Sequence, residues 1–319
     1  MKKLRIFTLI FSVAGLLALI IKISYSVSNH RYNLKVTKFK ETGKLDSDVK
    51  TSIEHKTFEK DGNSIHYFIS GNPEGEAIVF LHPAFGDHRC FDKQIDYFSP
   101  RFRIITVDMF GHGLTGTGKS KEKIASTPHY IAEILSFENI HKTHIAGVSL
   151  GSLLAQDFAL KYPEKTLSVT ALGGYNINKE QKEIAKAQRN EMFKWLFMMI
   201  FSMDSFRQYV ASICATDKIE QARFYESAKM FTRKSFTVMS GLDKLIGDRP
   251  YFQRPYPLLI VMGEQDLALA IQSARQWHTD DPSSELQIIE NAGHCANMDN
   301  TGKFNETLMK FLTKNENSR

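Results

Sequence analysis

The chain has 319 residues, of which 42% are hydrophobic and 24% are charged, the composition of an ordinary globular protein. That length allows one large domain with an insertion, or two small domains. Basic residues outnumber acidic ones by 41 to 35, but four of the basic residues lie in an N-terminal segment: Lys2, Lys3, Arg5 and Lys22. The rest of the chain is close to neutral, and we therefore expect no nucleic-acid partner.

Residues 1–28 have the features of a signal peptide or a membrane anchor. A basic start precedes an uncharged, mostly apolar run over residues 6–21, and Ser24 and Ser26 supply the small side chains that a signal peptidase reads. The run is shorter than the roughly 20 residues that span a bilayer. If the lysine after the run snorkels, residues 6–27 can still form an uncleaved transmembrane helix. Both alternatives predict an extracytoplasmic protein, either secreted or held by a single-pass membrane anchor.

The segment that follows is predicted to lead into the folded body. Residues 29–50 are polar and Lys-rich without sustained periodicity, and we interpret them as a linker. Strand-like runs over residues 56–59 and 64–70 flank an Asp61-Gly62 turn. This pattern predicts a β-hairpin at the edge of a sheet.

Strand and helix patterns then alternate, which predicts an α/β fold with a doubly wound, mostly parallel sheet. Continuous apolar runs bounded by turn residues are typical of strands buried on both faces. Such runs occupy residues 77–81, 104–107, 144–146, 167–172, 258–261 and 286–289. We expect the helices at residues 88–97, 127–135, 150–161, 270–278 and 304–312.

The alternation is interrupted over residues 175–255, where the pattern is purely helical. We predict that this segment, the cap, is inserted between two parts of a core, 51–174 and 256–315, with a tail at 316–319. Within the cap, residues 192–201 would place apolar side chains on every side of a helix. This pattern fits either a tightly packed helix or the wall of a pocket for an acyl group.

A serine between two glycines stands where a predicted strand passes into a predicted helix. The pentapeptide is Gly147-Val-Ser149-Leu-Gly151. Such a turn holds the serine in a strained conformation, close to a helix N-terminus that favours negative charge. The pattern therefore predicts that Ser149 is a nucleophile.

Taken together, the motifs of the chain resemble those of the α/β-hydrolase fold family, in particular its serine-nucleophile branch with a helical cap. The resemblance covers roughly residues 55–315. It depends on five motifs in the family's order: the His82-Pro-Ala-Phe-Gly86 loop, Asp108-Met-Phe-Gly-His-Gly113, the serine pentapeptide, Gly263-Glu-Gln-Asp266 and Asn291-Ala-Gly-His294. It implies the α/β-hydrolase fold, with the residues after β-strands meeting at one edge of the sheet.

The resemblance implies a catalytic triad of Ser149, Asp266 and His294. A serine hydroxyl needs a base within hydrogen-bond reach, and the His294 imidazole can take and return a proton near neutral pH. Asp266 would fix the imidazole tautomer and stabilise its charged form. Glu264 is a rival for that role. Asp108 and the other histidines are expected to be structural.

The oxyanion hole is expected to use the backbone N–H groups of Leu150, after the nucleophile, and Ala84, in the His82 loop. Pro83 stands where the family usually has glycine, so the loop can follow a different path. The N–H of Phe85 is then a substitute donor. Phe85 is also a candidate for the acyl pocket, with four side chains of the cap: Phe193, Phe197, Ile200 and Phe201.

The three cysteines, Cys90, Cys214 and Cys295, show no metal-site spacing, and we expect neither a metal nor a cofactor. We interpret Cys295, beside the candidate base, as a small buried residue.

A serine nucleophile excludes the family's dehalogenase and epoxide hydrolase branches, which carry aspartate at this position. The sequence therefore predicts an enzyme that hydrolyses a carboxylic ester or related acyl bond of a small, possibly lipophilic molecule through an acyl-enzyme. Two alternatives stay open. The protein could be a prolyl-type aminopeptidase, although no tryptophan flanks Ser149, or a catalytically idle member that binds a ligand.

Overall fold

A computed structural model describes residues 18–27, 29–38, 49–118, 122–250 and 253–316. Within these ranges eight strands form one sheet: Ile53–Lys60 (β1), Asn63–Gly71 (β2), Ala77–Leu81 (β3), Arg103–Val107 (β4), Thr143–Val148 (β5), Thr166–Leu172 (β6), Leu258–Gly263 (β7) and Glu285–Ile289 (β8). Their order across the sheet is β1-β2-β4-β3-β5-β6-β7-β8. The pairings of β2 with β1 and with β4 are antiparallel, and all the others are parallel. The predicted α/β fold with a mostly parallel sheet is confirmed.

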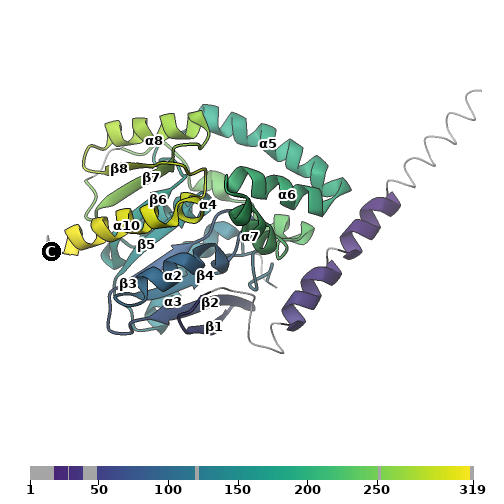
Figure 1. Ribbon diagram of the computed structural model, residues 1–319, viewed down its shortest axis with the longest axis horizontal. Helices are drawn as coiled ribbons and strands as arrows, with labels where there is room; N and C mark the ends of the chain where they lie inside the picture. The colour runs from purple at the N-terminus through teal and green to yellow at the C-terminus, as the bar shows by residue number, and fades with distance from the viewer. Residues whose placement is uncertain (1–17, 28, 39–48, 119–121, 251–252, 317–319) are drawn as a thin grey trace, which may run out of the picture.

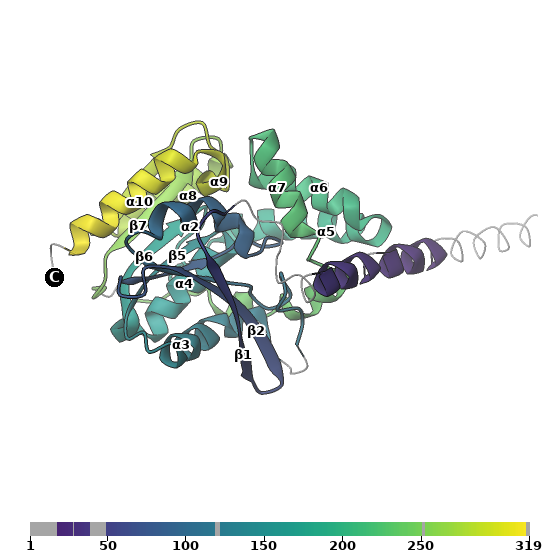
Figure 2. The ribbon, with the colours of Figure 1, turned by 60° about the horizontal axis from the view of Figure 1, so that its bottom comes forward.

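Helices cover both faces of this sheet, as Figures 1 and 2 show. Those of the core are His88–Phe91 (η1), Asp92–Phe98 (α2), Ile124–Ser126 (η2), Thr127–Phe137 (α3), Leu150–Lys161 (α4), Pro163–Lys165 (η3), Ala268–Asp280 (α8), Ala296–Asp299 (α9) and Thr301–Glu316 (α10). Side chains of α3, α4 and α8 share one buried apolar cluster, and those of α2 and α10 share another. The helices therefore divide between the two faces, as a doubly wound sheet requires.

The central strand β3 explains why this sheet forms. All five of its side chains are buried, and they alternate between the two apolar clusters. Val79 and Leu81 belong to the cluster of α3, α4 and α8, whereas Ile78 and Phe80 belong to the cluster of α2 and α10. A strand buried on both faces needs apolar residues at consecutive positions, which is the pattern in the sequence.

The predicted edge hairpin is present and consists of β1 and β2. The strands pair antiparallel, and Asp61 and Gly62 connect them with φ angles of 52° and 76°. Positive φ at both turn residues matches the twist of a two-residue hairpin, which is why an Asp-Gly pair favours this turn.

The cap is helical between β6 and β7, as the sequence predicts. It contains Lys182–Phe201 (α5), Met203–Cys214 (α6), Lys218–Ala228 (α7), Arg233–Val238 (η4) and Leu242–Lys244 (η5). In Figure 1, α6 and α7 lie between the sheet and the helices of residues 18–27 and 29–38. The outer ends of the cap, and the predicted division of the chain into segments, remain predictions.

Residues 18–27 and 29–38 are helical, so part of the segment interpreted as a linker has regular structure. These helices lie beside the cap in both views (Figures 1 and 2). The Arg31 guanidinium bonds to the Asp204 carboxylate of α6 at 2.6 Å, and the Lys35 ammonium lies 3.3 Å from a carboxylate oxygen of Glu226 in α7. The lack of helical periodicity in the sequence does not reveal this docking, which depends on charges far away in the chain.

The prediction of an extracytoplasmic, secreted or membrane-anchored protein is contradicted. No helix in the described part of the chain is long and apolar enough to cross a bilayer. The helix over residues 18–27 carries the charged Lys22 at an exposed position. Residues 1–17, which hold most of the predicted signal or anchor, lie outside the described residues.

Candidate active site

Ser149 occupies a sharp turn between β5 and α4. Its φ and ψ angles are 53° and −114°, a conformation that non-glycine residues rarely adopt. The flanking glycines permit the turn. A Cβ atom on Gly147 would lie 2.1 Å from the Gly151 carbonyl oxygen, and one on Gly151 would lie 2.1 Å from the Leu81 carbonyl oxygen. The pentapeptide therefore folds into the strained strand-to-helix turn that its residues predict.

Asp266 and His294 come from separate loops and are hydrogen-bonded to each other. Asp266 follows β7 and His294 follows β8, at the carboxyl ends of neighbouring parallel strands. The His294 Nδ1–H donates to the two carboxylate oxygens of Asp266, at 3.0 and 3.1 Å. The Leu267 N–H also donates to Asp266, at 2.7 Å. These bonds fix the orientation of the carboxylate and leave the imidazole Nε2 available for another partner.

Asp266 also changes the acidity of His294. Burial disfavours the charged imidazolium, but the hydrogen bond and the negative charge of Asp266 outweigh this effect and raise the pKa of His294 to about 9. The His294 side chain is 23% exposed and the Asp266 side chain 2% exposed, so the carboxylate is shielded while the imidazole remains accessible.

The His294 ring lies close to the serine turn. A Cβ atom on Gly173, directly after β6, would lie 3.1 Å from His294 Cε1. Ser149 is next to this position, because its N–H donates to the Leu172 carbonyl at 2.7 Å. No hydrogen bond joins the Ser149 hydroxyl to His294 among the contacts of the described residues. Such contacts are often long in ligand-free enzymes and tighten when substrate binds.

Glu264, the rival acid, has a different position. Its carboxylate accepts a hydrogen bond from the Asn291 N–H at 3.1 Å and makes no recorded bond to His294 in the described structure. The geometry therefore favours Asp266 for that role.

The loop at Pro83 forms a tight turn. The Gly86 N–H donates to the Pro83 carbonyl at 3.1 Å, and Phe85 has a φ of 71°. A positive φ at the third residue is the geometry of a type II turn, for which glycine is the usual choice. Within the described residues, the N–H groups of Ala84, Phe85 and Leu150 have no recorded protein acceptor.

The Phe85 ring of this turn packs against the cap. It is 4% exposed, and its centroid lies 5.0 to 6.1 Å from four aromatic rings: Trp195, Phe206, Phe231 and Phe236. Three of the four contacts are edge-to-face, a favourable geometry for aromatic pairs. The cost of a non-glycine residue at a positive φ is therefore offset by packing against the cap.

The predicted pocket residues of α5 lie elsewhere. Phe193, Phe197 and Phe201 are 62%, 66% and 39% exposed, and Ile200 is partly buried. None of them is among the ring partners of Phe85, so the structure does not bring them together with it. The inward side of α5 is formed instead by residues such as Trp195 and Met199.

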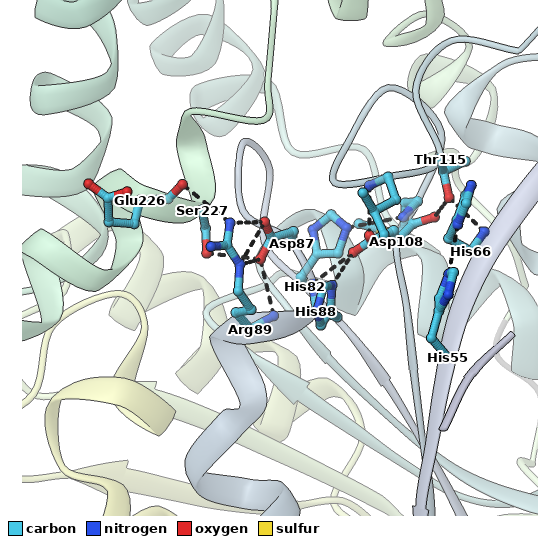
Figure 3. Close-up of polar contacts among 12 residues, drawn as sticks. His55, His66, His82, Asp87, His88, Arg89, Asp108, Thr115, Glu226 and Ser227 are labelled. Atoms are coloured by element: carbon cyan, nitrogen blue, oxygen red, sulfur yellow. Dashed lines mark hydrogen bonds and ion pairs between the residues drawn. The ribbon is translucent and has the colours of Figure 1, made fainter. Parts of the chain in front are cut away.

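Figure 3 shows a polar network that includes His82, His88 and Asp108, all of them buried. Asp108 Oδ1 accepts bonds from the N–H and Nδ1–H of His88, at 2.9 and 2.8 Å, and Oδ2 accepts one from the Leu114 N–H at 2.8 Å. Burial opposes both charges, but their attraction raises the pKa of His88 and lowers the pKa of Asp108. These bonds agree with the expected structural role of Asp108.

His82 connects this network to the turn. It accepts a hydrogen bond at Nε2 from the Met109 N–H at 3.1 Å and donates from Nδ1 to the Pro83 carbonyl at 2.8 Å. Full burial lowers the pKa of His82 and so favours the neutral ring, and the Met109 N–H and the Pro83 carbonyl set its tautomer. Proline at position 83 has no N–H to donate, but its carbonyl receives two hydrogen bonds.

A second part of the network joins the core to the cap (Figure 3). Asp87 and Arg89 form a buried ion pair, with Arg89 Nε 3.0 Å from Asp87 Oδ1. Ser227 of α7 donates to Asp87 at 2.9 Å, and Arg89 donates to the Glu226 carbonyl at 3.2 Å. The sequence pattern did not indicate this link, because its residues are ordinary charged and polar types far apart in the chain.

Asp299 is another residue that the sequence analysis missed. Its carboxylate accepts the Gly293 N–H at 2.8 Å, directly before His294, and the Thr216 N–H of the cap at 3.0 Å. An isolated aspartate after the histidine motif carries no pattern that would reveal this role.

The three cysteines are free and buried. The Cys295 N–H donates to the Cys214 carbonyl at 2.7 Å, so Cys295 fills a tight contact between the histidine loop and the cap. No cluster of His, Cys, Asp and Glu in the described residues has the arrangement of a metal site.

The order of the strands, the strained serine turn and the loops after β7 and β8 together define an α/β-hydrolase fold. The family model for the alpha/beta hydrolase fold matches residues 76–199. A putative 2-succinyl-6-hydroxy-2,4-cyclohexadiene-1-carboxylate synthase of Bacillus subtilis is 25% identical over 269 residues, covering 79% of this chain and 96% of the relative. An (E)-2-((N-methylformamido)methylene)succinate hydrolase of Acinetobacter baylyi is 23% identical over 260 residues, covering 81% of this chain and 97% of the relative.

A solved structure from work on the carboxylesterases of Nitrososphaera gargenis has a TM-score of 0.68 and 18% identity, covering 83% of this chain and 100% of that one. At this identity the likeness concerns the fold. The chain has the α/β-hydrolase fold, and the proteins that it is similar to include hydrolases of this fold.

Proposed function

We propose that the protein is a serine hydrolase of small carboxylic esters or related acyl compounds. The observation that supports this most strongly is the hydrogen-bonded Asp266–His294 pair, which lies beside a serine in a strained strand-to-helix turn. An imidazole oriented by a carboxylate next to such a serine is the arrangement that activates a hydroxyl for attack on a carbonyl carbon.

In the proposed mechanism, the Ser149 hydroxyl attacks the carbonyl while His294 Nε2 takes its proton. The tetrahedral intermediate carries a negative oxygen, for which the N–H groups of Leu150 and Ala84 are the proposed donors. Each donor of this kind typically contributes about 3 kcal/mol to stabilising the transition state. His294 then protonates the leaving group, and water releases the acid from the acyl-enzyme by the same steps. Asp266 holds the imidazole tautomer throughout.

The similar proteins support acyl chemistry without identifying the substrate. Besides the carboxylesterase from Nitrososphaera gargenis, they include an enol-lactonase and a succinate-derivative hydrolase, as those proteins are described. The cap, which reaches the turn at Phe85 through four aromatic rings, is the proposed determinant of which acyl group enters.

The test is hydrolysis of a chain-length series of p-nitrophenyl esters, from acetate to decanoate, with prolyl-anilide substrates in parallel. We expect ester hydrolysis by the wild type and none above background by Ser149→Ala. Turnover of the prolyl anilides alone would favour the aminopeptidase alternative. No turnover of any substrate would contradict the proposal.

A further inference from the structure

A cavity of about 230 Å³ lies away from the serine turn. It is bounded by the second half of α4, by α8, and by the two segments where the chain enters and leaves the cap. Gln156 and Leu160 of α4 line it, whereas none of Ser149, Asp266 and His294 does. The cavity is therefore separate from the candidate active site.

Two aromatic side chains with polar groups line this cavity and are almost fully buried. Tyr256 is 6% exposed and Trp277 is 4% exposed. Among the described residues, neither the Tyr256 hydroxyl nor the Trp277 indole N–H makes a recorded hydrogen bond to protein, and neither is among the enclosed side-chain atoms that lack a partner. Both donors are therefore accessible to solvent, and both can bond to a ligand. Burial raises the pKa of Tyr256 to about 12, so the hydroxyl keeps its proton and can donate at neutral pH.

Among the charged side chains that line the cavity, one cation has no recorded carboxylate partner in the described structure. Lys179 pairs with Asp280 at 2.5 Å, and Arg254 pairs with Asp281 at 2.8 Å. Arg249 instead donates to neutral oxygens: the Ile177 carbonyl at 2.8 Å, the Leu245 carbonyl at 2.9 Å and Asn178 Oδ1 at 3.4 Å. In the described structure the lining thus has a surplus positive charge, in addition to two solvent-accessible donors that make no recorded hydrogen bond to protein.

We propose that this cavity is a binding site for a small monocarboxylate with a flat apolar body. The carboxylate would bond to the Arg249 guanidinium, which suits planar, two-oxygen acceptors. The Tyr256 hydroxyl and the Trp277 indole N–H would also donate to the ligand, and their rings provide a flat apolar wall. The volume is below the range of roughly 300–1,000 Å³ typical of drug-sized ligands, so it suits a ligand with a single ring.

The two tryptophans of the chain allow binding to be located. Trp277 lines this cavity, whereas Trp195 packs against Phe85 in the cap. In full-length protein labelled with 5-fluorotryptophan, two ¹⁹F resonances are expected, and the variants Trp195→Phe and Trp277→Phe assign them. Titration with sodium benzoate should shift the Trp277 resonance in a saturable manner and leave the Trp195 resonance in place.

Three comparisons test the chemistry of recognition. Benzyl alcohol, which has the ring without the carboxylate, should bind at least about tenfold more weakly than benzoate, as expected for loss of a charge-assisted pair. Arg249→Gln should weaken benzoate binding by a similar factor. Tyr256→Phe keeps the ring and should weaken it by about threefold, as for loss of one hydrogen bond. If Arg249→Gln perturbs the fold of the cap, Tyr256→Phe still tests whether the ligand binds in this cavity.

Several outcomes would overturn the proposal. They are a shift of the Trp195 resonance alone, equal affinity for benzyl alcohol and benzoate, unchanged binding in both Arg249→Gln and Tyr256→Phe, or no shift up to the solubility limit of sodium benzoate. Ser149→Ala should bind benzoate at this cavity as the wild type does. The result therefore does not depend on whether the proposed ester hydrolysis is correct.

Discussion

The serine turn and the cap are held together by different kinds of contact. At the serine turn, backbone atoms approach so closely that only glycine fits at positions 147 and 151. In the cap, α5 leaves the rings of Phe193 and Phe197 more than half exposed, while Trp195 on the same helix packs against Phe85. Backbone contacts allow little variation, whereas side-chain packing tolerates many alternatives. The first region is therefore suited to chemistry and the second to substrate choice.

The largest expected effect concerns the proposed base and its carboxylate. Asp266→Asn keeps the shape of the side chain but removes its charge and stabilises the wrong imidazole tautomer, so we expect kcat to fall by about 10⁴-fold. Ester hydrolysis by the purified variant measures this. A loss of less than tenfold would show that Asp266 does not orient His294.

The pH dependence of kcat/KM tests the same interaction between Asp266 and His294. His294 must be neutral to accept a proton, so activity should rise as the pH climbs through its pKa. Because Asp266 raises that pKa to about 9, the midpoint of kcat/KM for the wild type should lie above the ordinary 6.5 of histidine. In Asp266→Asn, burial acts without the opposing charge, and the midpoint should fall by about one unit or more. An identical midpoint in both proteins would contradict this account.

The next effect tests the close backbone contacts at the serine turn. In Gly151→Ala, the new Cβ would meet the carbonyl oxygens of Leu81 and His82 at 2.1 and 2.8 Å, and backbone atoms cannot rotate away. We expect the free energy of unfolding to fall by about 4 kcal/mol or more. Gly302→Ala is the matched control, since a Cβ there meets no atom within 4 Å, and it should gain up to about 1 kcal/mol. Urea unfolding of both variants provides the comparison, and equal stabilities would refute it.

The smallest expected effects are changes in the free energy of unfolding when two phenylalanines of the cap are replaced. Phe206 is 0% exposed and contacts the Phe85 ring, so Phe206→Ala should lower the free energy of unfolding by about 3 kcal/mol. Phe197 is 66% exposed, and Phe197→Ala should change the free energy of unfolding by about 0.5 kcal/mol or less. Thermal unfolding measures both. Similar losses for the two variants would mean that α5 is buried in solution by contacts that the described structure does not contain.

The sequence was most informative where function depends on local backbone geometry. The edge hairpin follows from an Asp-Gly pair, and the serine turn follows from two glycines at fixed spacing, because few other residues allow these conformations. His294 could be proposed as the base because its motif after the last strand resembles the histidine motif of the family.

Other features could not be predicted because they depend on tertiary contacts. Residues 192–201 are apolar on every side, so periodicity cannot tell that Trp195 faces inward and Phe197 outward. The link between Asp87 and Ser227 joins two residues 140 positions apart, and neither belongs to a motif. The helix over residues 29–38 forms where polar composition predicted a linker.

The most direct test of the central claim is labelling by a fluorophosphonate probe, followed by mass spectrometry of the modified peptide. The probe reacts covalently with a serine that is activated by a neighbouring base. We predict a single adduct on Ser149 in the wild type, none in Ser149→Ala, and normal labelling in Ser212→Ala, which removes an exposed serine of the cap. No labelling of the wild type, or undiminished labelling of Ser149→Ala, would contradict the assignment of Ser149 as the nucleophile.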